Sequence, residues 1–265
     1  MPNMIGLSYL RRFQLINLSL QKTGTKSVAG IFGSYRAAHE FQHDAATEAL
    51  SAYRNGELNE NEVRAYLLTR DAVGQLEVDS ASFNAWFAEQ YVDLFPGARF
   101  LIVLRHPIEW LESVLTHIQR DVVHTARTDQ PYPDRFKRQA KLVVKSFAPE
   151  AFLDQEQLIR ALPEISKGLL VHWQERNTHL IDTVPVDRRL VLRTDRLSSS
   201  LPQLAQFVGV SAKNLIADQS HLHRKPDHPT TLNKYHVKID TGDALETWQT
   251  WQNTVFSSQD TANST

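Results

Sequence analysis

Cysteine is absent from the 265 residues, and neither sign of charge dominates. The lack of cysteine excludes disulfide bonds, cysteine-ligated zinc and a cysteine nucleophile, and it fits a reducing compartment. The net charge is −1, from 29 basic and 30 acidic residues, so no overall field attracts nucleic acid or an anionic membrane. No run approaches the roughly 20 apolar residues of a membrane-spanning helix, and the first residues lack the pattern of a secretion signal. We therefore expect a cytoplasmic protein without nucleic-acid or membrane partners.

Short apolar runs alternate along the chain with segments of helical periodicity. The clearest strand is Arg99–Leu104, a continuous apolar run typical of a parallel strand that is buried on both faces. Further extended segments are expected at residues 13–20, 36–41, 75–78 and 189–192. This alternation indicates a single-domain α/β fold with a mainly parallel central sheet flanked by helices. We expect the domain to span residues 13–256, with an N-terminal extension over 1–12 and a disordered tail over 257–265.

Helices are expected between the strands, together with two irregular stretches. Residues 151–162 and 165–181 are expected to form two separate helices. The polar stretch 120–134 contains two prolines and is expected to be a loop or a mobile lid. Residues 221–240 are rich in His, Lys and Pro and show no regular pattern. In a parallel α/β sheet, ligands bind beyond the carboxyl ends of the strands, so the site is expected at that edge.

The first strand is followed by a turn rich in Lys, Thr and Gly, and then by the start of a helix. The N–H groups of such a loop and the positive end of the helix dipole converge on an anion. Charge and hydroxyl donors are added by Lys22, Thr23, Thr25, Lys26 and Ser27. The G-x-x-x-x-G-K-[ST] pattern of nucleotide triphosphatases is not met, because Ser19 replaces its first Gly and Thr25 separates Gly24 from Lys26. The sequence therefore indicates a phosphate-binding loop of another type.

Two motifs in this order resemble signatures of the sulfotransferases that use 3′-phosphoadenosine 5′-phosphosulfate (PAPS). Lys22-Thr23-Gly24-Thr25 resembles the K-[ST]-G-T-[TS] phosphosulfate loop of that family. Arg105-His106-Pro107 follows the clearest strand, and Ser113 lies eight residues after Arg105, as in the family's second signature, a strand followed by Arg-Asp-Pro and a later Ser. A strand and helix that end in Phe-Val-Gly-Val at Val210 resemble a third block. The resemblance spans about residues 13–210.

The resemblance implies a P-loop-like sulfotransferase fold and an enzyme that transfers the sulfuryl group of PAPS to a hydroxyl of a small-molecule acceptor. The transfer would be an in-line displacement without a metal. Lys22 would stabilise the leaving oxygen, and Arg105 and Ser113 would hold the 3′-phosphate. The phosphosulfate would be held by the loop residues Lys22, Thr23, Gly24, Thr25, Lys26 and Ser27.

The chain departs from the family pattern at several positions. His106 replaces the usual Asp, and Ser27 stands where cytosolic members place a Trp that stacks on adenine. The family's late glycine-rich loop, which binds the 3′-phosphate, has its nearest match at Arg224 and Lys225, where the charges are present without the glycines. The stacking aromatic residue must therefore come from elsewhere in the chain.

A general base must take the proton of the acceptor hydroxyl. Glu40 follows the second extended segment, eighteen residues after Lys22, and several branches of the family take a Glu from this region. His39 and His43 flank it and are alternatives. Asp79, which follows another short strand, is a candidate acceptor contact. The aromatic residues Phe83, Trp86 and Phe87 are either core or acceptor wall.

Two other functions remain open from the sequence. A P-loop nucleotide or small-molecule kinase would need Mg²⁺ and the glycine–lysine spacing that is absent here. A catalytically inactive nucleotide-binding relative would keep the fold without the chemistry, and the presence of Lys22 and Arg105 argues against it. The eleven histidines form no metal-ligand pattern, so no metal is expected. The acceptor and the oligomeric state are not determined by the sequence.

Overall fold

The computed structural model describes residues 10–127, 149–221 and 231–256. Five parallel strands form one sheet in the order β2-β3-β1-β4-β5. The strands are β1 Leu15–Asn17, β2 Ala37–His39, β3 Val78–Ser80, β4 Arg99–Leu104 and β5 Arg189–Arg193. The predicted α/β class and parallel sheet are confirmed.

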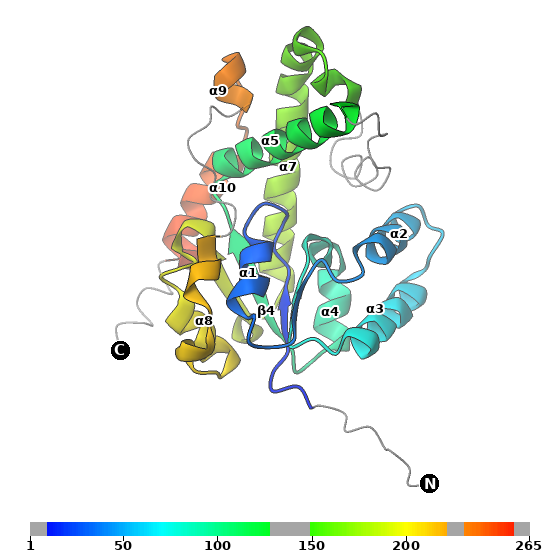
Figure 1. Ribbon diagram of the computed structural model, residues 1–265, viewed down its shortest axis with the longest axis vertical. Helices are drawn as coiled ribbons and strands as arrows, with labels where there is room; N and C mark the ends of the chain where they lie inside the picture. Colours follow the sequence, from blue (N-terminus) through cyan, green and yellow to red (C-terminus); the bar gives the residue numbers. More distant parts are fainter. Residues whose placement is uncertain (1–9, 128–148, 222–230, 257–265) are drawn as a thin grey trace.

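Helices connect the strands and cover both faces of the sheet (Figure 1). The α-helices are α1 Thr25–Ile31, α2 His43–Arg54, α3 Glu60–Gly74, α4 Ala88–Leu94, α5 Pro107–Arg127, α7 Gln155–Thr183, α8 Leu201–Val208, α9 Thr231–Tyr235 and α10 Ala244–Trp251. The shorter elements are the 3₁₀ helices η1 Ser82–Phe87, η2 Pro149–Phe152, η3 Val186–Arg188, η4 Thr194–Arg196, η5 Ala212–Asn214 and η6 Ala217–His221, and the π-helical turn η7 Gln252–Phe256.

Alternate residues of the central strands point to opposite faces, which divides the core in two. Phe100 and Ile102 of β4 belong to the cluster that includes buried residues of α4, α5, α7 and α10. Leu101 and Val103 belong to the cluster formed with α1 and α8. Figure 1 shows α1 and α8 on one side of the strands, with α3 and α4 on the other. The two-sided burial explains why β4 reads as an unbroken apolar run.

Two helices run further than the sequence indicated. The expected loop at 120–134 is wrong for its first part, because α5 continues to Arg127 and buries Val122; residues 128–134 lie outside the described residues. The two helices expected at 151–162 and 165–181 are one helix, α7, with Pro163 inside it. A proline in a helix costs about 3 kcal/mol or more, and burial of the flanking residues Leu162 and Ile165 offsets that cost.

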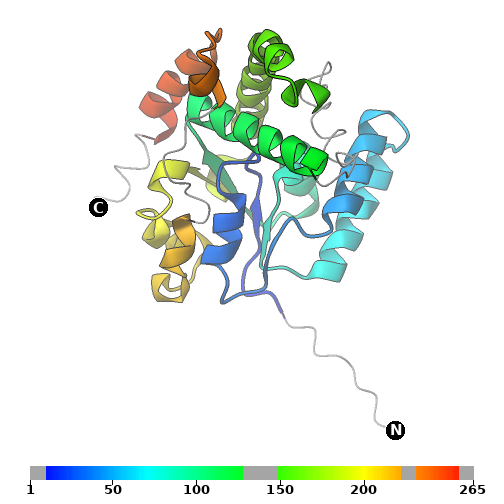
Figure 2. The same cartoon turned by 45° about the horizontal axis from the view of Figure 1, so that its top comes forward.

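Boundaries elsewhere differ by a few residues. β3 begins at Val78 rather than at residue 75, because Gln75 ends α3 in the left-handed conformation with φ 43°. The stretch 221–240 contains one short helix, α9, among its described residues. The carboxyl ends of the strands lie beneath α5, which crosses the upper half of the molecule in both views (Figures 1 and 2).

Candidate active site

The loop after β1 is held in place by buried hydrogen bonds from three directions. Thr23 Oγ1 donates to the carbonyl of Leu20 (2.6 Å), and Thr194 Oγ1, beyond β5, donates to the carbonyl of Thr23 (3.0 Å). Trp110 Nε1 of α5 donates to the carbonyl of Gln21 (2.8 Å). Gly24 adopts φ 106°, a conformation that glycine reaches without strain. The loop is therefore a preformed turn that opens α1.

A buried polar network lies beneath this loop. Asn17 Nδ2 donates to Ser80 Oγ (2.8 Å), and Ser80 Oγ donates to the carbonyl of Thr25 (2.7 Å). Ser19 Oγ donates to Asn17 Oδ1 and accepts from the N–H of Val103 (2.7 Å). Satisfied buried networks of this kind make a single arrangement rigid. The network connects β1, β3, β4 and α1, so the loop is tied to the middle of the sheet.

Arg105 lies at the carboxyl end of β4, directly beside the first loop. Its Nη1 donates to the carbonyl of Lys22 (3.2 Å), and its own carbonyl accepts from Trp173 Nε1 of α7 (3.2 Å). Its Nε is buried without a hydrogen-bond partner among the described residues and lies 3.6 Å from Glu109 Oε2. The two predicted anion-binding segments thus meet at one edge of the sheet, as the topology of a parallel sheet requires.

Glu40 comes immediately after β2 and is held by the residues that follow β3. Its Oε1 accepts from both the N–H and the Oγ of Ser82, at 2.9 Å each. Its Oε2 has no hydrogen-bond partner among the described residues and lies 3.9 Å from His43 Nε2. His39 Nδ1 donates to the carbonyl of Ser80 (3.1 Å). One carboxylate oxygen is therefore fixed, and the other faces the histidine three residues further on.

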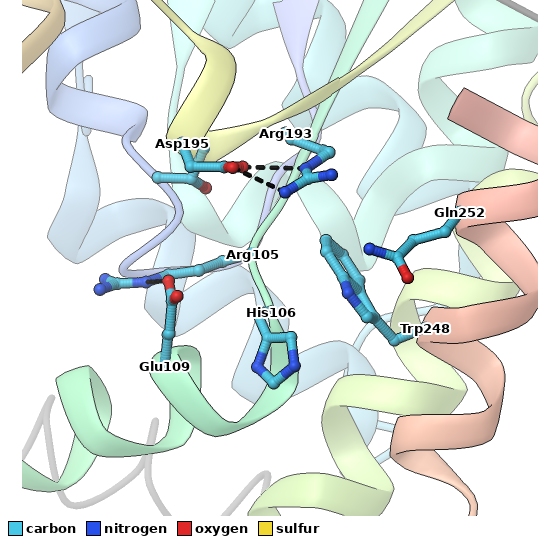
Figure 3. A pocket seen from close by; sticks show the side chains of 8 residues that line it. Arg105, His106, Glu109, Arg193, Asp195, Trp248 and Gln252 are labelled. Atoms are coloured by element: carbon cyan, nitrogen blue, oxygen red, sulfur yellow. Dashed lines mark hydrogen bonds and ion pairs between the residues drawn. The ribbon is translucent and has the colours of Figure 1, made fainter. Parts of the chain in front are cut away.

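A pocket of about 100 Å³ adjoins Arg105 at the ends of β4 and β5 (Figure 3). Arg193 makes two hydrogen bonds to Asp195 (2.9 and 2.6 Å), and its guanidinium lies 5.6 Å from the centroid of the Trp248 ring. The other lining residues are His106, Glu109, Thr194 and Gln252. The lining thus combines two arginines, each next to a carboxylate, with an indole ring that can stack on a flat, unsaturated group.

The chain matches the model of a family described as a sulfotransferase domain over residues 14–215, which is most of its length. The chain belongs to the sulfotransferase domain family. Solved structures with a similar fold include a sulfotransferase from Alicyclobacillus acidocaldarius, at 17% identity and a TM-score of 0.43, covering 82% of this chain and 88% of that one. Another is the sulfotransferase domain from the curacin biosynthetic pathway, at 10% identity and a TM-score of 0.36, covering 88% and 86%. No curated protein sequence matches.

Family membership confirms the predicted resemblance and supports sulfuryl transfer as the activity of this sulfotransferase domain. The roles of individual residues stay predictions. Among them, Lys26 is exposed, Ser27 is only 3% exposed and Thr25 is also buried. Ser113 is half-buried on α5. Arg224 and Lys225 lie outside the described residues.

Several weaker candidates have structural roles in this sulfotransferase domain. Asp79 forms a buried ion pair with Arg70, so its carboxylate is already occupied. Phe83 and Phe87 are buried in the core, whereas Trp86 is only partly buried. Of the two roles expected for these aromatic residues, Phe83 and Phe87 therefore have the core role. Trp86 lies at the border of the core.

The pocket residues Arg193 and Trp248 were missed by sequence reasoning. Arg193 ends a strand, and the rule that located Arg105 could have found it. Trp248 carried no signal, because only the packing of α10 brings it to this edge. No group of three or more His, Cys, Asp and Glu residues suited to a metal ion occurs within the described parts of the chain. In the same residues, no helix has the length and apolarity to cross a membrane, and cytoplasmic location stays a prediction.

Proposed function

We propose that this chain transfers the sulfuryl group of PAPS to a hydroxyl oxygen of a small-molecule acceptor. The observation that carries the proposal is the contact between Arg105 Nη1 and the carbonyl of Lys22. It supports a single site with two anion-binding segments, one after β1 and one after β4. A donor with phosphate groups at two separate positions suits such a pair.

The residues present fit an anionic donor. Arg105 Nε is a buried donor without a hydrogen-bond partner in the described part of the chain, and the half-buried guanidinium can donate charge-assisted hydrogen bonds to a phosphate oxygen. Lys22 and the first N–H groups of α1 would hold the phosphosulfate, and Arg105 with Ser113 would hold the 3′-phosphate. Arg193 and Trp248 border the same region and would contact the nucleoside.

Glu40 would act as the general base, with Lys22 as the electrostatic catalyst. Bound PAPS supplies a sulfur atom whose bond to the 5′-phosphate oxygen breaks as the acceptor oxygen bonds to it. Glu40 Oε2 accepts the hydroxyl proton, because Oε1 is occupied by Ser82. Lys22 neutralises the charge that develops on the leaving phosphate oxygen, which retains the electron pair.

Backbone conformation gives independent support for these two positions. Lys22 and Glu40 are both left-handed, with φ of 66° and 55°, and so is Gln42 with φ 52°. Such conformations are unfavourable for residues other than glycine and concentrate at functional sites. Three of the five such residues in the described chain lie at this edge of the sheet.

Thermal melting separates a protein that binds the bisphosphate from a kinase. Adenosine 3′,5′-bisphosphate at 100 times its Kd is expected to stabilise the protein by about 2.7 kcal/mol, or a rise in Tm of roughly 5–11 °C. ATP with Mg²⁺ should produce no comparable shift. A shift with ATP and Mg²⁺ alone would favour a kinase and reject this proposal.

The variant Lys22→Ala then tests the chemistry. We expect it to reduce sulfuryl transfer by about 10²–10³-fold, the typical effect of removing one electrostatic contact to the leaving charge, while much of the bisphosphate-induced shift persists. Lys213→Ala, which removes an exposed lysine of η5 to which no role in the site is assigned, is the control. Binding without transfer in the unaltered protein, with every acceptor tested, would favour an inactive relative.

A further inference from the structure

Three nitrogen-bearing side chains gather around the ring of Trp86, on the border of the core. The guanidinium carbons of Arg54 and Arg176 lie 4.9 and 4.1 Å from the centroid of the Trp86 ring. His172 stacks on the same indole, with ring centroids 5.3 Å apart and planes at 26°. Arg54 ends α2, Trp86 belongs to η1, and the other two residues lie one turn apart on α7. Three segments that are distant in sequence thus meet at one indole.

Neither arginine is in an ion pair with any of the described residues. Neither makes a side-chain hydrogen bond within residues 10–127, 149–221 and 231–256, and Arg176 Nε is buried without a partner. Burial lowers the pKa of Arg176, and the charge of Arg54 lowers it further, against the opposing effect of Glu175 and Glu89. Both carboxylates are exposed. Arg54 is exposed and Arg176 is half-buried, and an anion placed between them would be attracted to both guanidinium groups.

His172 provides a second, independent sign of a missing partner. It is 8% exposed, and its Nε2 is buried without a hydrogen bond within the described residues. Burial lowers its pKa to about 3, with the charges of Arg176 and Arg54 as further causes, so the ring is neutral near pH 7. Buried polar atoms in native proteins almost always have a partner, and a ligand oxygen would supply one.

Short chains of contacts connect the cluster to both proposed catalytic residues. Trp86 is four residues after Ser82 on η1, or about 8 Å at the rise of a 3₁₀ helix, and Ser82 holds Glu40. On the other side, the ring of His172 is 6.3 Å from that of Trp110, which donates to the residue before Lys22. The cluster therefore packs against elements that hold both ends of the proposed site.

We propose that Arg54, Arg176 and His172 bind an anionic group of the acceptor, and that the Trp86 ring forms the wall beside it. The acceptor class is then a small hydroxyl compound that carries a carboxylate, phosphate or sulfate. This inference rests on the proposed sulfuryl transfer, because it assigns the second substrate of that same site. It gives the cluster a role that packing alone does not, because Arg176 Nε and His172 Nε2 are buried without hydrogen-bond partners among the described residues.

Matched pairs of acceptors test this assignment. Transfer from PAPS is measured with 4-hydroxyphenylacetate and its methyl ester, with glucuronate and glucose, and with glycerol 3-phosphate and glycerol. We expect kcat/KM to be at least about 10-fold higher for the charged member of a pair, as one charge-assisted contact provides. Arg54→Gln and Arg176→Gln should each reduce this preference about 10-fold. Arg160→Gln, an exposed arginine of α7 paired with Glu156, should leave it unchanged.

The outcomes distinguish this inference from the function on which it rests. Suppose that adenosine 3′,5′-bisphosphate raises Tm and that the neutral and charged acceptors of each pair react equally well. The anionic site is then overturned, and sulfuryl transfer stands. If neither the bisphosphate shift nor transfer occurs, both are overturned. If the bisphosphate binds and no acceptor reacts, the shift in Tm that each acceptor causes is measured with the bisphosphate present. A larger shift for the charged member of each pair, lost in Arg54→Gln, supports the anionic site. Equal shifts for the two members reject it. Arg54 is exposed, so that variant folds even where Arg176→Gln does not.

Discussion

Asp79→Asn is expected to destabilise the protein by about 3–5 kcal/mol, the usual effect of removing one partner of a buried ion pair. Arg70 is 4% exposed and Asp79 is 8% exposed. Arg70 Nη1 and Nη2 both donate to the carboxylate, and they also donate to Tyr91 Oη (3.0 Å) and to the carbonyl of Phe41 (3.0 Å). Burial is the largest single effect and opposes the charge of Arg70, but the hydrogen bond with Asp79 and the charges of the groups around it together outweigh burial and raise the pKa of the guanidinium. Without the carboxylate, a desolvated cation remains.

Thermal unfolding followed by circular dichroism measures this loss. At 2–4 °C per kcal/mol for a domain of this size, Tm should fall by roughly 6–20 °C. The control is Arg64→Gln, which removes exposed ion pairs with Glu60 and Asp93 and should change stability by less than about 1 kcal/mol. An Asp79→Asn protein within 1 kcal/mol of the unaltered one would refute the argument that the pair is desolvated.

A double variant separates stability from positioning. Replacing both charges, as Arg70→Met with Asp79→Leu, removes the uncompensated ion and should recover part of the lost stability. It should not recover kcat, because Arg70 no longer holds the carbonyl of Phe41, the residue after Glu40. A double variant as unstable as Asp79→Asn, or one with full turnover, would contradict this division of roles.

Two further predictions concern individual carboxylates. Glu40→Gln keeps an oxygen that can accept from Ser82 and loses only the base, so kcat should fall roughly 10²–10⁴-fold. The bisphosphate-induced Tm shift should be unchanged. A kcat within 5-fold of that of the unaltered protein would assign the role of base to His39 or His43. Glu77 is 1% exposed, and hydrogen bonds from Arg12 lower its pKa from 4.5 to about 2. The ionised Glu77 carboxylate therefore stabilises the folded protein by at most about 3 kcal/mol. This stabilisation is present above pH 4.5 and is lost as the pH falls from 4.5 to 2. In Glu77→Gln, Tm should depend less on pH between 4.5 and 2 than it does in the unaltered protein. An unchanged dependence of Tm on pH would reject the role given to Glu77.

Local sequence features predicted the parts of the fold that depend on local physics. β4 was found with its observed bounds because both of its faces are buried and its apolar run is unbroken. α7 was divided in two because proline is unfavourable in a helix, whereas burial on both sides of Pro163 decided otherwise. The stretch 82–94 has helical periodicity throughout, but it begins as η1 and continues as α4, a change of helix type that periodicity does not resolve.

The sequence by itself determined the α/β class, the family and the meeting of the Lys22 loop with Arg105, because strand ends and short motifs are local and a parallel sheet brings its carboxyl ends to one edge. The tertiary structure alone decided which side chains face each other across that edge. Arg70 with Asp79, Arg193 with Trp248, and Arg54 with Arg176 at Trp86 are contacts set by helix packing. Two of these three join residues far apart in the chain, and no spacing in the sequence encodes the distance between them.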